Sequence, residues 1–205
     1  MAARLLNYSQ VLTSTRQHIV LVLVSSLLAI AAAVPLGIMI SRPQFKKIGI
    51  IVENVINIAQ TIPSLAILAL FMTILGLGFN TAIFALWCYS LLPILRNTFA
   101  GINSVPEGAI QAAKGMGMTP WRILQKIELP LAYPVVMAGI RTAVVINVGT
   151  ATLATFISAG GLGELIVTGI SVGRDSLIVA GALLSAIMAV LFDHILSQVE
   201  AVLTG

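Results

Sequence analysis

The chain carries little charge for its length. Only 9% of its 205 residues are Asp, Glu, Lys or Arg, whereas a typical soluble domain has about 25%. Hydrophobic residues make up 59% of the sequence, and the mean hydropathy is +1.06. This composition excludes a soluble globular domain, and we predict an integral membrane protein.

Residues that usually carry chemistry are also scarce. The single cysteine, Cys88, excludes an internal disulfide and lies in an apolar run, where we expect inert packing. The two histidines, His18 and His194, show no metal-ligand spacing, and no C-x-x-C, H-E-x-x-H or phosphate-binding G-x-x-x-x-G-K-[ST] motif occurs. We therefore expect no metal, no cofactor, no catalytic residue and no nucleotide site. The net charge of +4 comes from residues scattered at segment ends, which argues against a nucleic-acid partner.

Five apolar segments are long enough to cross a bilayer, which takes about 20 helical residues. The first exceeds the apolar core of a signal peptide, so we expect it to be retained. A glycine-rich stretch, residues 158–175, should form a short interfacial or re-entrant helix. The sequence thus predicts one all-α transmembrane domain over residues 1–205 with five transmembrane helices. The expected spans are 18–40, 48–75, 81–100, 131–157 and 176–203.

One polar stretch, residues 104–130, interrupts these apolar segments, and we call it the coupling segment. Ser104 and Glu107 have the spacing of a capping box, which predicts a helix start. Gly115 and Gly117 should end that helix, because glycine adopts left-handed backbone angles at little cost. Thr119-Pro120 has the residue types of an N-cap and first helical position, so a second short helix should begin there.

The second short helix has an apolar pattern with a period of three residues. Trp121, Leu124 and Ile127 should share one side of it, and Arg122, Gln125 and Lys126 should face the other way. Leu129-Pro130 should close the segment, because proline cannot continue the hydrogen-bond ladder.

The spacing within the coupling segment resembles a known motif. Gln111-Ala112-Ala113, then Gly117, then Ile127-Glu128-Leu129-Pro130 matches the EAA motif (EAA-x3-G-x9-I-x-L-P) of bacterial ABC importer permeases, except that Gln111 replaces the usual Glu. Glutamine still forms hydrogen bonds but cannot form a salt bridge. The resemblance implies a coupling helix that docks on a cytoplasmic ATPase. The residues that it assigns to this contact are Gln111, Ala112, Ala113, Gly117, Ile127, Leu129 and Pro130.

A second resemblance lies in the second apolar segment. Residues 60–66, QTIPSLA, are similar to a stretch of osmoprotectant ABC permeases, which import glycine betaine, carnitine or choline. Together the two resemblances imply the five-helix fold of the methionine importer, a partner permease (an identical or similar chain), a dimer of ATPase subunits and an extracytoplasmic binding protein. They also imply that ATP hydrolysis resides on the ATPase chain. Because aromatic residues are only 6% of the chain, we expect tight cation selection on the binding protein.

Polar residues recur inside two of the apolar segments. Glu53, Asn57, Gln60 and Ser64 follow helical spacing and would share one face, and Asn147, Thr150 and Ser158 would do the same. Such faces either line a translocation path or hold helices together by hydrogen bonds. A charge within the membrane needs a partner, so we expect Arg141 to pair with Glu53.

The distribution of Lys and Arg predicts the orientation. With the N-terminus outside, seven of these residues fall on the inner side and three, Arg4, Arg16 and Arg174, on the outer side. The coupling segment and the C-terminus then lie in the cytoplasm. Two alternatives stay open: an ABC permease for an amino acid such as methionine, and an ion-coupled secondary carrier. The second would need a buried carboxylate, for which Glu53 is the candidate, and would leave the coupling segment unexplained.

Overall fold

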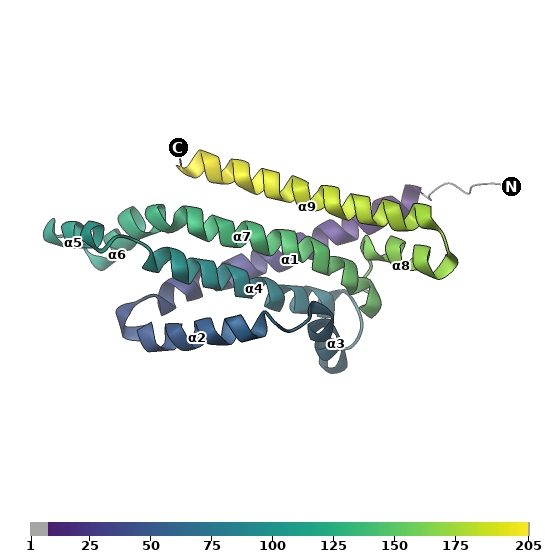
Figure 1. Ribbon diagram of the computed structural model, residues 1–205, viewed down its shortest axis with the longest axis horizontal. Coiled ribbons are helices and arrows are strands. Elements are labelled where there is room, and N and C mark those ends of the chain that lie inside the picture. The colour runs from purple at the N-terminus through teal and green to yellow at the C-terminus, as the bar shows by residue number, and fades with distance from the viewer. Residues whose placement is uncertain (1–7, 205) are drawn as a thin grey trace. The chain divides into compact units, whose positions relative to one another are not determined.

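The structure, a computed structural model, describes residues 8–204, and every regular element in that range is helical (Figure 1). Arg4, assigned to the outer side above, lies outside the described residues. The helices are α1 Tyr8–Ile40, α2 Lys46–Ala59, α3 Ser64–Leu75, α4 Phe79–Asn103, α5 Glu107–Gly115, α6 Pro120–Ile123, α7 Leu129–Ala151, α8 Gly163–Val172 and α9 Asp175–Thr204. The all-α prediction is confirmed.

Four helical stretches are long and apolar enough to cross a membrane, and a fifth is added when α2 and α3 count as one broken span. The long stretches are Tyr8–Ile40, Phe79–Asn103, Pro120–Ile157 and Asp175–Val202. Each contains most of a predicted span. The glycine-rich stretch forms the short apolar helix α8, as predicted.

The predicted interruption of the second span at Pro63 is confirmed. Helix α2 ends at Ala59, and Pro63 has φ −57° and ψ 134°, an extended conformation before α3. Proline lacks an N–H and disfavours helical angles in the residue before it, which explains the break at Ile62-Pro63. The prediction that Ser64 continues the helical face of Glu53 is therefore wrong, because Ser64 is the first residue of a separate helix.

The described residues form two compact units, and α1, α4, α7 and α9 contribute to both. The first unit contains residues 8–29, 62–90 and 144–193. Its core is made of aliphatic side chains that are at most 1% exposed, among them Leu21, Leu86, Val148, Leu162 and Leu165. Burial of these side chains excludes both lipid and water, so this unit has its own packed interior.

Two neighbouring side chains of α1 hold the glycine-rich stretch of the first unit. The imidazole of His18 is fully buried; its Nε2 lies 3.0 Å from the carbonyl oxygen of Val148, and its Nδ1 accepts a hydrogen bond from the N–H of Leu162 at 3.2 Å. Gln17 Oε1 accepts from the N–H of Gly161 at 3.1 Å. Because Nδ1 is the acceptor, Nε2 carries the proton, and the ring is a neutral bridge between backbone groups.

Asn147 of α7 is also fully buried in the first unit. Its Nδ2 donates to the hydroxyl oxygens of Ser25 and Ser26 at 2.7 and 2.9 Å. Thr150 donates to the carbonyl of Ile146, one turn back in its own helix. Ser158 follows a 3-10 turn and has a left-handed φ of 58°. Asn147 and Thr150 lie three residues apart within α7, as predicted, but the prediction that Ser158 shares their face is wrong, because α7 ends at Ala151.

The second unit contains residues 30–61, 91–143 and 194–204. The largest fully buried side chain of its core is Ile94, and Ala113 and Ala132 are also fully buried. Arg141 has an ion-pair partner, as expected, but that partner is Glu200 of α9 at 3.0 Å and not Glu53. The prediction of Glu53 was wrong because residue spacing cannot show which helix packs against α7.

Candidate functional site

The candidate site is the coupling segment, which lies entirely in the second unit. Its first helix, α5, ends in a turn built on Gly117, whose φ is +76°. The N–H of Gly117 donates to the carbonyl of Lys114, and the N–H of Met118 donates to the carbonyl of Ala113 at 3.1 Å. This is the six-residue pattern of a glycine-terminated helix, as predicted.

The start of α5 differs from the prediction. Ser104 and Glu107 do not form a capping box, because the Ser104 hydroxyl donates to the carbonyl of Gly101 at 2.8 Å. Helix α5 begins directly after Pro106, and no side chain caps it. Glu107 instead accepts a long hydrogen bond of 3.4 Å from Gln111 Nε2. Gln111, the first residue of the EAA-like motif, is thus exposed, and its side chain forms a hydrogen bond within its own helix.

The second helix of the segment starts as predicted. Thr119 is the N-cap, its hydroxyl accepts from the N–H of Arg122 at 3.4 Å, and Pro120 follows as the first helical residue. The apolar side of this helix is only partly buried, however. Trp121 is 64% exposed, while Ile123 and Leu124 are buried. A large exposed aromatic on this segment is a good candidate for contact with another protein.

Pro130 does not close the segment, contrary to the prediction. Residues 120–157 form one continuous helical stretch, which passes through a π-helical turn at Leu124–Glu128. In this turn the N–H of Leu129 donates to the carbonyl of Leu124, five residues back. The wider turn accommodates a proline that has no N–H for the usual ladder. The part of the coupling segment from Pro120 onward is therefore helically continuous with α7.

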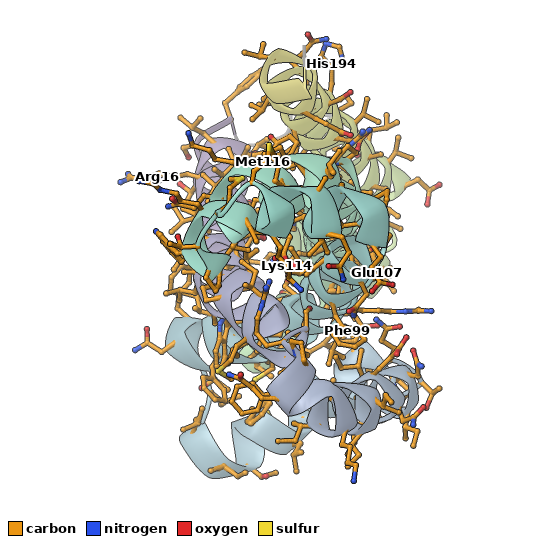
Figure 2. The ribbon with its side chains drawn as sticks, turned by 90° about the vertical axis from the view of Figure 1, so that its left-hand side faces the viewer. Arg16, Phe99, Glu107, Lys114, Met116 and His194 are labelled. Carbon is orange, nitrogen blue, oxygen red and sulfur yellow. The ribbon has the colours of Figure 1, made fainter. Side chains whose placement is uncertain are left out.

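A groove runs along α5. Its volume is about 490 Å³, and its lining combines the turn after α1, the end of α4 and the coupling segment, including Gln44, Asn103, Glu107, Gln111 and Lys114. Figure 2 shows Glu107 and Lys114 on one side of α5 and Met116 on the other. From α5 the groove is lined by the polar or charged Glu107, Gln111 and Lys114 together with the apolar Ile110, while exposed Met116 lies on the opposite side.

An ion pair forms part of the groove lining. Arg42 Nη2 lies 2.6 Å from Glu128 Oε2. The Glu128 side chain is only 9% exposed and that of Arg42 is 27% exposed. Sequence analysis missed this pair, because Glu128 occupies the unspecified position of the I-x-L-P pattern and Arg42 looks like an ordinary interfacial charge. The one available signal was an acidic residue inside an otherwise apolar motif.

The residues assigned to the ATPase contact have different environments. Ala113 is fully buried, Ile127 and Leu129 are half-buried, and Gln111, Ala112, Gly117 and Pro130 are exposed. The exposed members are available to a partner, whereas Ala113 packs within the second unit.

The residues predicted to line a path are divided between the two units. Glu53, Asn57 and Gln60 belong to the second unit, and Ser64, Asn147 and Thr150 belong to the first. Asn57 is exposed and Glu53 is half-buried, but Asn147 is fully buried against Ser25 and Ser26. The contacts of Asn147 within the chain are those of interhelical hydrogen bonding.

Comparison with known proteins decides the family. The model of the family described as "Binding-protein-dependent transport system inner membrane component" matches residues 33–204. The chain belongs to this family. The binding-protein-dependent family consists of inner-membrane components of transport systems, so the chain is a multi-pass transport component of the inner membrane.

Relatives within the binding-protein-dependent family match over nearly the whole chain. The "Choline transport system permease protein OpuBB" of Bacillus subtilis (strain 168) is 45% identical over 198 residues, covering 97% of this chain and 90% of the relative. The "Glycine betaine/carnitine/choline transport system permease protein OpuCB" of the same organism is 43% identical with the same coverage. The "Osmoprotectant import permease protein OsmY" of Salmonella typhimurium is 46% identical over 182 residues, covering 89% and 77%.

Solved structures confirm the permease fold of this family. An inward-facing structure of the MetNI methionine ABC transporter matches with a TM-score of 0.84 at 22% identity and covers 100% of both chains. An amino acid ABC transporter crystallised with histidines matches with a TM-score of 0.77 at 18% identity, covering 95% of this chain and 94% of that one. The predicted likeness to the methionine importer is therefore correct for the fold.

Proposed function

We propose that this chain is the permease subunit of an ATP-driven importer for osmoprotectants, namely quaternary ammonium solutes such as glycine betaine, carnitine and choline. The observation that carries the proposal is the 43–46% identity to permeases named for these solutes. The methionine importer shares the fold at only 22% identity, so it supports no conclusion about substrate.

In this proposal ATP hydrolysis takes place on a separate cytoplasmic ATPase, and two permease chains, identical or similar, form the path as one transmembrane domain each. The coupling segment docks on the ATPase through Gln111, Ala112 and the turn at Gly117, all of which are exposed. Glu53, Asn57, Gln60, Ser64, Asn147 and Thr150 are proposed to contribute to the translocation path. An extracytoplasmic binding protein delivers the solute and supplies most of the selectivity.

The proposed orientation places the N-terminus outside and the C-terminus in the cytoplasm. The excess of Lys and Arg on the inner side supports it, since seven such residues fall there against three outside. The same orientation puts the coupling segment on the side where an ATPase would be, so charge distribution and motif agree.

Uptake into proteoliposomes tests the function. Vesicles that contain the permease, its ATPase and the binding protein should accumulate radiolabelled choline or glycine betaine only when ATP is supplied to the ATPase side. An ATPase variant that cannot hydrolyse ATP should abolish accumulation, and a hundredfold excess of methionine should leave it unchanged. Competition by methionine would favour the amino-acid alternative. Uptake that follows an ion gradient without ATP would favour a secondary carrier.

A further inference from the structure

The partly buried ion pair of the groove joins two parts of the second unit that are distant in sequence. Arg42 lies in the turn after α1, and Glu128 is the last residue of the π-helical turn that leads from the coupling segment into α7. The N–O distance of 2.6 Å is that of a strong, charge-assisted hydrogen bond. The pair therefore couples the position of the turn after α1 to the position of the π-helical turn.

Arg42 is fixed on the α1 side as well. Its Nε donates to the carbonyl of Ile38 at 3.2 Å, a carbonyl in the last turn of α1. Carbonyls at a helix end have no partner within the helix, and a cation is favoured there by the helix dipole. The guanidinium thus bridges the end of α1 and Glu128, so that the two are connected through one rigid, planar group.

The π-helical turn decides where Glu128 points. A π turn inserts an extra residue, and each residue of a helix accounts for a rotation of about 100° around its axis. A regular α-helix through residues 124–128 would turn the Glu128 side chain away from its present direction. Proline at position 130 favours the wider turn, and in this chain the residue that the turn directs toward Arg42 is Glu128.

We propose that the Arg42–Glu128 pair is a positioning pair that transmits ATPase-driven movement of the coupling segment to α1. It rests on the proposed function, in which the coupling segment is the part that an ATPase moves. Helix α7 receives the movement directly through the continuous helical stretch of residues 120–157. Helix α1 is not part of that helical stretch, and the ion pair gives it a direct non-covalent link to the coupling segment. Both residues are positioning residues and neither touches the solute.

The test compares the solute imported per ATP hydrolysed in proteoliposomes that contain the permease, its ATPase and the binding protein. Glu128→Gln and Arg42→Gln should each lower this ratio at least fivefold, while the ATPase still co-purifies within twofold of the wild-type amount. The charge-swapped variant R42E/E128R should recover at least half of the wild-type ratio. Arg42→Lys retains the charge and should keep the ratio within threefold, which decides the question if the swapped variant fails to fold.

A matched control uses the other paired glutamate of the second unit. Glu200→Gln neutralises an ion-pair partner of Arg141 by the same chemical change, and α9 is not part of the coupling segment. Its ratio of solute to ATP should stay within twofold of wild type.

Three results would overturn the proposal: wild-type ratios in both single variants, a loss of co-purified ATPase as large as the loss of import, or an equal loss in Glu200→Gln. Failure of the proposed function is distinguishable, because the wild-type vesicles themselves would then show no ATP-dependent import.

Discussion

Gly117→Val should separate the permease from its ATPase while leaving the permease folded. Gly117 has a φ of +76°, and no atom lies within 4 Å of the position where a Cβ would stand. The substitution therefore causes no steric clash, but it forces a β-branched residue into the left-handed region, at a cost of about 1–3 kcal/mol. The free permease can relax this exposed turn, and docking requires the left-handed conformation again. The strain therefore reduces the free energy of docking and lowers the affinity of the permease for the ATPase about 5–150-fold.

The turn at Gly117 makes this effect specific to docking. It connects α5 with α6 and so determines how Gln111 and Trp121, both exposed, are presented together. The measurement is the amount of ATPase that co-purifies with affinity-tagged permease, and we expect less than a tenth of the wild-type amount for Gly117→Val. Its thermal unfolding midpoint in detergent should change by only a few degrees.

Asparagine at the same position is the matched control, because asparagine tolerates left-handed angles far better than valine. Gly117→Asn should retain at least a third of the bound ATPase. An equal loss of co-purified ATPase in the valine and asparagine variants would show that side-chain size at this position, rather than backbone conformation, weakens docking. Full retention with valine would exclude the turn from docking altogether.

Gly163→Ala should strongly destabilise the first unit, whereas the same change at Gly149 should not. A Cβ on Gly163 would stand 2.6 Å from the carbonyl carbon of Thr152 and closer still to its oxygen. The obstructing atoms belong to the backbone of the 3-10 turn at Thr152–Ile157, so no side-chain rotation can relieve the overlap. Overpacking of this kind costs up to about 3 kcal/mol, or roughly 6–12 °C in the unfolding midpoint for a chain of this size.

Thermal unfolding of the purified permease in detergent measures this effect. Gly149→Ala is the matched control, because its Cβ would meet no atom within 4 Å and the residue lies inside helix α7. Alanine favours helix over glycine by about 1 kcal/mol, so this control should unfold at the same temperature or slightly higher. An unchanged midpoint for Gly163→Ala would mean that α8 does not approach the 3-10 turn as closely as described.

Local signals in the sequence predicted much of the architecture. The length of the apolar segments predicted the membrane spans, and Pro63 predicted the break between α2 and α3. Gly117 and Thr119 predicted the turn between α5 and α6. The break and the turn each depend on the conformational preferences of one or two residues, and the spans depend on the composition of one continuous segment. None of these features depends on which helices pack together.

Errors arose where the outcome depends on residues far apart in the chain. The partner of Arg141 is Glu200 of α9, and the partner of Glu128 is Arg42. No period or cap specifies such pairs, because they follow from which helices pack together. Pro130 does not end the helical stretch, because the π turn before it lets the helix continue through a residue that normally ends one.

The central claim, that the coupling segment contacts an ATPase, has a direct test by site-specific cross-linking in membranes that contain the complete importer. Replacement of Cys88 by serine leaves a chain without cysteine, into which Gln111→Cys introduces a single exposed site for a photoreactive maleimide. Glu164→Cys, at the start of α8 in the first unit, is the control position and is also exposed. We predict a permease–ATPase product from position 111 and none from position 164. No product from position 111, or equal yields from both positions, would contradict the account.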